Sequence, residues 1–358
     1  MEQPSTTSSR LPMTLGLDLG DRSTSWCLVG DAGVVARDST RTEQRSLTDA
    51  CRRAGSLGAE RVVMEVSTHS PWVSRLAASA IPDVVVANAL AVGRMLAVTR
   101  KSDRRDAEML ARLGRADIEL LRPIQHRGAQ AQADLSLLRS RAQLIAARTS
   151  LINHVRGACK AVGIQLPTCS TESFHKAMAD AIPAELKKAQ DAVLSAIEHL
   201  TAKVKELDRE VAGMCKSVYP ETALLTQVPG VGPICGLTFV LTVEQPDRIA
   251  QTRNVGAYFG LVPKRSQSGD CDPELHITRC GDADMRRLLV TSAQYVLGPF
   301  GPDTDLRRFG KRLEAKGGKA AKRRAVVAVA RKLAVLLLSL WRSGQEYVPL
   351  KNSQAGMA

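Results

Sequence analysis

The chain has 358 residues, and its 50 lysines and arginines against 36 aspartates and glutamates give a formal net charge of +14. That excess favours a polyanionic partner such as nucleic acid, while an aromatic content of 3% argues against base stacking as the main device. The eight cysteines include no Cys-X-X-Cys pair, the start shows no signal peptide, and Arg331 and Lys332 interrupt the most apolar run. We therefore expect a soluble, cytoplasmic protein with no membrane segment that contacts phosphates through arginine and backbone groups.

The first 125 residues predict an α/β domain that follows a disordered tail at residues 1–11. Three strands close in sequence come first and two more then alternate with helices, which is the order found in the ribonuclease-H-like fold. The expected strands cover residues 13–20, 24–29, 33–38, 61–66 and 83–87, and the expected helices cover residues 46–57, 71–80 and 102–113. We assign residues 12–125 to this domain.

Four acidic residues in this domain are notable for where they fall. Asp18 and Glu65 each lie within an otherwise apolar predicted strand, where an unpaired carboxylate is costly. Asp103 and Asp106 stand three residues apart at the start of a predicted helix, so their side chains project from one face. A helix dipole or a nearby arginine explains such acids singly. Together they form a hard-oxygen ligand set suited to a two-metal phosphodiester site.

An actin-like or sugar-kinase ATPase is the rival class for this domain. Its first phosphate loop can also read Asp-Leu-Gly-Asp-Arg-Ser-Thr, as residues 18–24 do here. That fold needs a second glycine-rich phosphate loop and an adenosine motif, and neither is found before the sequence becomes helical and basic. Metal-dependent phosphodiester chemistry is therefore the favoured interpretation.

Residues 126–218 predict two long helices, each with a heptad seam. Apolar and small residues recur at alternating spacings of three and four, and the outer faces of the first helix, including Arg148, are basic. The seams run along Leu135, Leu138, Ala142, Ile145, Thr149 and Ile152, and along Val193, Ile197, Leu200, Val204, Leu207 and Val211. The helices form either a hairpin within one chain or a coiled coil between subunits. Self-association is favoured, since such long seams must be covered.

Residues 219–347 are expected to form a mainly α-helical domain, with a tail at residues 348–358. Within it, residues 224–237 resemble a helix–hairpin–helix element. Gly230 and Gly232 either expose backbone N–H groups to a phosphate or form a plain tight turn. The basic context favours phosphate contact.

Ser268 precedes Gly269 in a polar loop of the same domain. A serine hydroxyl that attacks phosphorus needs cations near the non-bridging oxygens. Such cations occur on both sides of it: Lys264, Arg265, Arg279, Arg286 and Arg287. From chemistry alone most Ser-Gly pairs are turns, and Ser266 offers a second hydroxyl nearby. Ser268 is preferred for the glycine that follows it.

The motifs, taken in order, resemble those of the DEDD transposases of the insertion-sequence one-ten family, relatives of the Piv-type DNA invertases. The likeness covers nearly the whole chain. It rests on Gly16-Leu-Asp-Leu-Gly, Val63-Met-Glu-Val, Ser102-Asp-Arg-Arg-Asp-Ala, Leu225-Thr-Gln-Val-Pro-Gly-Val-Gly, Phe259-Gly-Leu-Val-Pro, Ser268-Gly and Gly281-Asp-Ala-Asp-Met-Arg-Arg-Leu-Leu.

This resemblance implies a RuvC-like N-terminal domain in which Asp18, Glu65, Asp103 and Asp106 are catalytic and bind Mg²⁺ or Mn²⁺. It also implies that Ser268 attacks a DNA phosphate and holds the strand as a phosphoserine during exchange. Family members act on donor and target DNA, assemble from dimers into a tetramer, and use a structured noncoding guide RNA, the bridge RNA. The resemblance thus implies an RNA-guided DNA recombinase that moves its own insertion sequence.

The sequence departs from the family pattern beside the serine. Asp270, Asp272 and Glu274 stand where many relatives have a basic run, and Arg279-Cys280-Gly281 stands where a lysine commonly precedes the glycine. Two other interpretations stay open. One is a metal-dependent, structure-specific endonuclease that activates water, with Ser268 structural. The other is a non-catalytic nucleic-acid-binding or RNA-chaperone protein.

Overall fold

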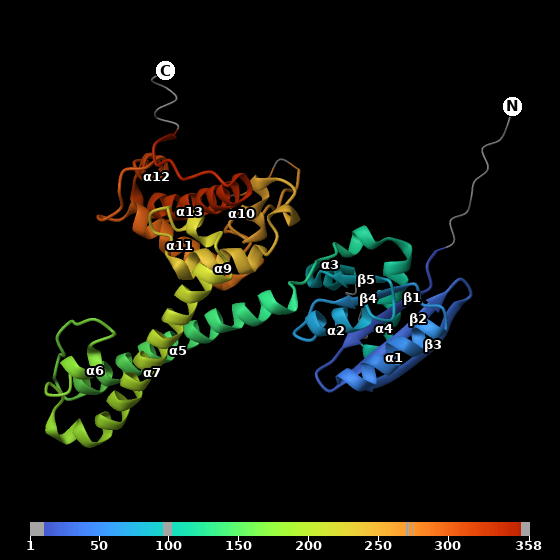
Figure 1. Ribbon diagram of the computed structural model, residues 1–358, viewed down its shortest axis with the longest axis horizontal. Coiled ribbons are helices and arrows are strands. Elements are labelled where there is room, and N and C mark those ends of the chain that lie inside the picture. The colour runs from blue at the N-terminus through green and yellow to red at the C-terminus, as the bar shows by residue number, and fades with distance from the viewer. Residues whose placement is uncertain (1–10, 96–101, 270, 272, 274, 352–358) are drawn as a thin grey trace. The chain divides into compact units, whose positions relative to one another are not determined.

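The computed structural model describes residues 11–95, 102–269, 271, 273 and 275–351 (Figure 1). The chain divides into two compact units, residues 1–127 and 128–358. Most of the predicted N-terminal tail and the acidic residues Asp270, Asp272 and Glu274 lie outside the described residues. The finer division at residues 125, 218 and 347 stays a prediction.

The first unit is built on a mixed five-stranded sheet with the order β3-β2-β1-β4-β5. β1 pairs antiparallel with β2 and β2 with β3, whereas β4 is parallel to both β1 and β5. The strands are β1 (Thr14–Leu19), β2 (Ser23–Gly30), β3 (Gly33–Arg41), β4 (Arg61–Glu65) and β5 (Asp83–Ala87). Short turns join the antiparallel strands and helices join the parallel ones, as strand geometry requires. The predicted α/β class is confirmed.

Helices cover both faces of this sheet. α1 buries Leu47 and Cys51 against Leu15 and Leu17, and α2 packs on the same side. Residues of β1 that alternate with these leucines face α4 instead. The helices are α1 (Gln44–Ser56), α2 (Ser70–Ala77), α3 (Ala89–Met95) and α4 (Asp103–Ala116), with the 3-10 turn η1 (Ile118–Leu121) after them.

α4 lies so close to the sheet that β1 must carry a glycine beneath it. A Cβ on Gly16 would stand 2.0 Å from the carbonyl oxygen of Ala107 and 2.7 Å from the backbone nitrogen of Ala111. Toward its other end, α4 accepts a hydrogen bond of 2.6 Å at the Gly114 carbonyl from Arg61, the first residue of β4. The C-terminal end of α4 therefore lies over the start of β4, and its N-terminus points to the carboxyl ends of β1 and β4.

The second unit begins with two long helices, α5 (Ala129–Ala161) and α7 (Ala184–Ser217), which pack on each other as an antiparallel hairpin (Figure 1). The short α6 (Phe174–Ala177) lies in the connection between them. Val155 and Ile197 belong to one buried cluster along the hairpin, and Leu135 and Val211 to another. The seams thus cover each other within the chain, which is one of the two predicted arrangements. Association between subunits stays a prediction.

One turn of the α5 seam differs from the prediction. Thr149 was expected to be buried and Arg148 to lie on an outer face, but Thr149 is exposed and the Arg148 residue is only 5% exposed. Arg148 donates to the hydroxyls of Thr201 at 3.3 Å and Thr171 at 3.4 Å. The prediction is wrong here because the long aliphatic stem of an arginine can fill a gap between two helices that a threonine side chain cannot.

The rest of the second unit is helical around one apolar core. Phe239, Phe259 and Leu337 are fully buried in it. Its helices are α8 (Thr222–Leu225), α9 (Pro233–Val243), α10 (Val255–Tyr258), α11 (Ala283–Leu297), α12 (Asp305–Glu314) and α13 (Gly318–Ser343), with 3-10 turns η2 (Pro246–Arg248) and η3 (Thr252–Asn254). Among the described residues, no helix combines the length and apolar character that crossing a bilayer requires.

The contact between Gly16 and α4 can be tested by adding one methyl group. We expect Gly16→Ala to lower the free energy of unfolding by about 3 kcal/mol, because the new Cβ overlaps helix backbone that cannot move aside. Urea unfolding followed by circular dichroism measures this. Gly157→Ala is the control, since nothing lies within 4 Å of its Cβ, and it should gain up to about 1 kcal/mol of helix propensity. Wild-type stability in Gly16→Ala would contradict the packing.

Candidate functional site

Two of the four predicted acids occupy neighbouring positions at the carboxyl ends of β1 and β4. Leu17 pairs with Met64 in the parallel register, so the next positions along the two strands are Asp18 and Glu65. Side chains two residues apart on a strand share a face. Gly16 contacts α4 directly and Val63 packs against Leu110 of that helix. Asp18 and Glu65 therefore lie on the α4 side of the sheet.

The other two acids begin α4. Asp103 and Asp106 lie in its first turn after the N-cap Ser102, with Asp103 exposed and Asp106 half-buried. Since the N-terminus of α4 points to the carboxyl ends of β1 and β4, the fold directs all four acids to one end of the sheet. We call this the acid end, defined by Asp18, Glu65, Asp103 and Asp106.

The acid end suits a divalent metal ion in its chemistry and backbone placement. Carboxylate oxygens are the ligands that Mg²⁺ and Mn²⁺ prefer. Among the described residues, however, no three His, Cys, Asp or Glu side chains converge closely enough to hold an ion. Asp18 and Glu65 are each engaged in another polar or electrostatic interaction.

Ser268 lies in the second unit, in a hairpin-like loop between α10 and α11. Two isolated bridges order the loop, Pro263 with Ile277 and Ser268 with Cys271. The backbone N–H of Ser268 donates to the Cys271 carbonyl at 3.1 Å, and the Cys271 N–H donates back at 3.1 Å. Gly269 follows with φ of +56°, a left-handed conformation typical of a tight turn. The Ser268 residue is exposed, on a backbone held from both sides of the turn.

The cations predicted around Ser268 divide into two groups. Lys264, Arg265 and Arg279 are exposed along the loop. Arg286 instead ties the base of the loop together, donating from Nη1 to the carbonyls of Phe259 at 3.2 Å and Cys280 at 2.9 Å. Arg287 forms an ion pair of 3.2 Å with Asp284. The first group is therefore exposed along the loop, whereas Arg286 holds together the base of the loop that carries Ser268.

The two glycines of the predicted helix–hairpin–helix element have different surroundings. Gly230 has φ of +84°, and a Cβ there would stand 3.0 Å from the Ser292 carbonyl oxygen of α11. Packing thus accounts for Gly230 without any ligand. Gly232 is exposed at the N-cap of α9, and nothing lies within 4 Å of its Cβ position. The N-terminus of α9 is accordingly more open to a phosphate at Gly232 than at Gly230.

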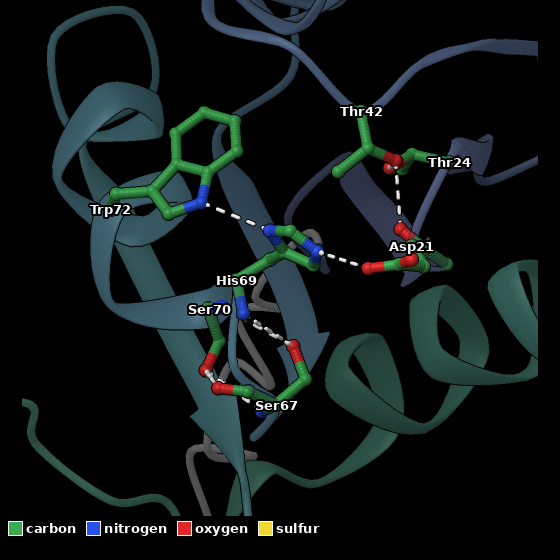
Figure 2. Close-up of polar contacts among 8 residues, drawn as sticks. Asp21, Thr24, Thr42, Ser67, His69, Ser70 and Trp72 are labelled. Atoms are coloured by element: carbon green, nitrogen blue, oxygen red, sulfur yellow. Dashed lines mark hydrogen bonds and ion pairs between the residues drawn. The ribbon is translucent and has the colours of Figure 1, made fainter. Parts of the chain in front are cut away.

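Sequence reasoning missed a polar group formed by Asp21, His69 and Trp72, which Figure 2 shows. Asp21 lies in the turn after β1, and His69 lies between β4 and α2. His69 Nε2 stands 3.3 Å from Asp21 Oδ1, and Trp72 Nε1 donates to His69 Nδ1 at 3.2 Å. Asp21 and His69 are 48 positions apart in sequence, and His69 and Trp72 are three apart. Only the short spacing from Asp18 to Asp21 and from Glu65 to His69 could have indicated the group.

Two transposase families match the chain. Residues 15–163 match the DEDD group of IS110 elements, described as Transposase. Residues 222–305 match the family described as Transposase IS116/IS110/IS902 family. The first match contains the acid end and α5, and the second contains the α9 turn and the Ser268 loop.

Curated relatives match over similar lengths. The transposase for insertion sequence element IS1111A of Coxiella burnetii is 24% identical over 70% of this chain and 69% of its own length. A Sinorhizobium fredii protein named as a transposase is 30% identical over 69% of this chain and 64% of its own length. The transposase for insertion sequence element IS1328 of Yersinia enterocolitica is 24% identical over 62% of this chain and 63% of its own length. The chain thus spans about two thirds of these relatives.

Thiol chemistry provides a test of how open the Ser268 loop is. Cys271 and Cys280 are exposed, whereas burial raises the pKa of Cys51 and Cys235 to about 11. A rise of that size lowers the reactive thiolate fraction at pH 8 by about 100-fold. We expect Cys271 and Cys280 to be among the fast-reacting thiols with Ellman's reagent in the native chain, and the fast count to fall by one in Cys271→Ser. An unchanged fast count in that variant would contradict the exposure of the loop beside Ser268.

Proposed function

The chain belongs to the IS116/IS110/IS902 family of transposases, and on that premise we propose that it moves an insertion sequence by serine-mediated DNA recombination. The observation that carries the proposal is the placement of Ser268. The Ser268 residue is exposed, and its backbone forms two hydrogen bonds to Cys271. A nucleophile needs this combination of access and fixed position.

The proposed reaction exchanges one ester for another at phosphorus. Ser268 Oγ attacks a DNA phosphate, so the Oγ–P bond forms while the bond from phosphorus to the sugar oxygen of the leaving strand breaks. The serine proton is released and the leaving sugar oxygen takes up a proton. A free sugar hydroxyl of another strand then reverses the step and releases the serine. Lys264, Arg265 and Arg279 supply positive charge for the non-bridging oxygens.

The acid end has the second role in this proposal. We assign Asp18, Glu65, Asp103 and Asp106 as the carboxylates that hold Mg²⁺ or Mn²⁺. When bound, the metal ion supplies positive charge for a DNA phosphate. The strand order of the sheet and the acids at the carboxyl ends of β1 and β4 support a RuvC-like fold for this unit.

Donor and target DNA are the proposed substrates, and the charge of +14 supports phosphate contact by either of them. We also propose that a structured bridge RNA guides the choice of sites and that dimers form a tetramer. If the RNA recognises the DNA sequence by base pairing, the protein needs few aromatic residues to stack on bases, and this chain has few.

Trapping the covalent intermediate tests the serine proposal. With a duplex that carries one end of the element, denaturing detergent should trap DNA attached to the wild-type chain. Ser268→Ala should yield none, because the attacking oxygen is gone, whereas Ser266→Ala should still form the adduct. A gel of the reaction products measures both. Recombination by Ser268→Ala at the wild-type rate would favour a metal-dependent nuclease that activates water.

Neutralising the carboxylates tests the acid end. Asp18→Asn and Asp106→Asn should each lower the recombination rate by about 100-fold or more, since several kcal/mol of charge stabilisation are lost. Calorimetric titration with Mn²⁺ should show weakened binding in the same variants. Asp49→Asn, on an exposed site of α1, removes the same charge and should change neither quantity. Full activity in EDTA would overturn the metal assignment.

A further inference from the structure

His69 is held in one orientation and one tautomer. The indole N–H of Trp72 can only donate, so His69 Nδ1 accepts that bond and the ring proton lies on Nε2. His69 Nε2 then donates toward Asp21 Oδ1 at 3.3 Å (Figure 2). The rings of His69 and Trp72 meet edge to face, with centroids 6.1 Å apart. The direction of the Nε2–H group is therefore set by the protein.

The loop that carries His69 is also fixed. The backbone N–H of Ser67 donates to the Ser70 hydroxyl at 2.9 Å, and the Ser70 N–H donates to the Ser67 hydroxyl at 3.2 Å. The Ser70 hydroxyl donates to the Ser67 carbonyl at 2.9 Å and contacts His126 Nε2 at 2.9 Å. These bonds fix the chain between β4 and α2, so His69 is preorganised rather than one of many exposed rotamers.

Both members of the pair project from the acid end. His69 follows Glu65 by four residues at the carboxyl end of β4, and Asp21 follows Asp18 by three at the carboxyl end of β1. These two strands are adjacent and parallel. A donor in this position lies beside the carboxylates to which the proposed function brings a DNA phosphate.

The hydrogen bond that Asp21 accepts from His69 Nε2 is weak. The side chain of Asp21 is 95% exposed, whereas that of His69 is 25% exposed. An ion pair or hydrogen bond to so exposed a carboxylate contributes on the order of 1 kcal/mol or less. A phosphate oxygen offers the same acceptor chemistry and keeps its charge at any ordinary pH. Replacing one anionic oxygen by another leaves the Nε2–H bonded throughout.

We propose that His69 is a DNA-contacting residue of the acid end, where its Nε2–H donates to a backbone phosphate oxygen, and that Asp21 occupies this donor until DNA displaces it. The proposal rests on the proposed function for the location of the DNA. It adds a contact that positions the strand beside the carboxylates, together with an acidic side chain that competes for the contact.

Binding measurements separate this proposal from the chemistry of strand exchange. The full-length Ser268→Ala chain is titrated, in 0.1 M salt with Ca²⁺, with a fluorescent duplex carrying one end of the element. Asp21→Ala should tighten binding by about fivefold, the upper value for removing an exposed competing hydrogen bond to a carboxylate. Asp49→Ala removes an equal charge from an exposed site of α1 and should tighten binding by less than about twofold.

His69→Phe keeps a ring but removes the donor, and it should weaken binding by about tenfold. In Asp21→Ala/His69→Phe the gain from Asp21→Ala should vanish, because the two side chains act on one contact. The urea midpoint of each variant checks that it folds, and His69→Gln, which retains an N–H donor, should recover part of the affinity.

Equal gains in Asp21→Ala and Asp49→Ala would overturn the proposal, as would an Asp21→Ala gain that persists without His69. A gain of the same size with an RNA duplex of the same sequence would overturn the assignment to DNA. None of these outcomes depends on whether Ser268 is the nucleophile. Failure of the serine mechanism and failure of the His69 contact are therefore distinguishable.

Discussion

The close approach of α4 to β1 is the constraint on which the acid end depends. Because Gly16 has no side chain, the backbone of α4 rests directly on the strand at Ala107 and Ala111. A helix held this close cannot slide along the sheet without backbone overlap, since packed interiors tolerate little added volume. The first turn of α4 is thereby held over the strand ends that bear Asp18 and Glu65. The absence of a side chain at Gly16 thus determines where the first turn of α4, which carries Asp103 and Asp106, lies.

The strands and the acid end were largely predictable because their signals are local. Each predicted strand and helix of the first unit occurs within a few residues of its expected place, and acids inside apolar strands indicated a candidate site without any knowledge of topology. The parallel register of β1 and β4 then explains why Asp18 and Glu65 occupy neighbouring positions. That register comes from the crossover connection, whose presence was visible in the alternation of helix and strand.

What could not be predicted depends on contacts between residues distant in sequence. The seam periodicity placed Thr149 inside the hairpin, but the space opposite Thr201 accepts Arg148. Gly230 suggested a phosphate loop, yet packing against α11 explains it. The bond between His69 and Asp21 joins residues 48 positions apart that share no periodic pattern. Such pairings follow from tertiary structure, and local propensity carries no information about them.

Arg148 also gives the α5–α7 hairpin a property that an all-leucine seam would not have. Its Nε has no hydrogen-bond partner among the described residues, and its other nitrogens reach only two threonine hydroxyls at long distances. A buried cation is costly wherever it stands, and it is least costly where those hydroxyls are present. If α7 slid by one heptad, Leu194 or Asp208 would replace Thr201 opposite Arg148, and Arg141 would lose its hydrogen bond to Asp208. The register of the α5–α7 hairpin is therefore specified by polar contacts of two arginines as well as by apolar packing.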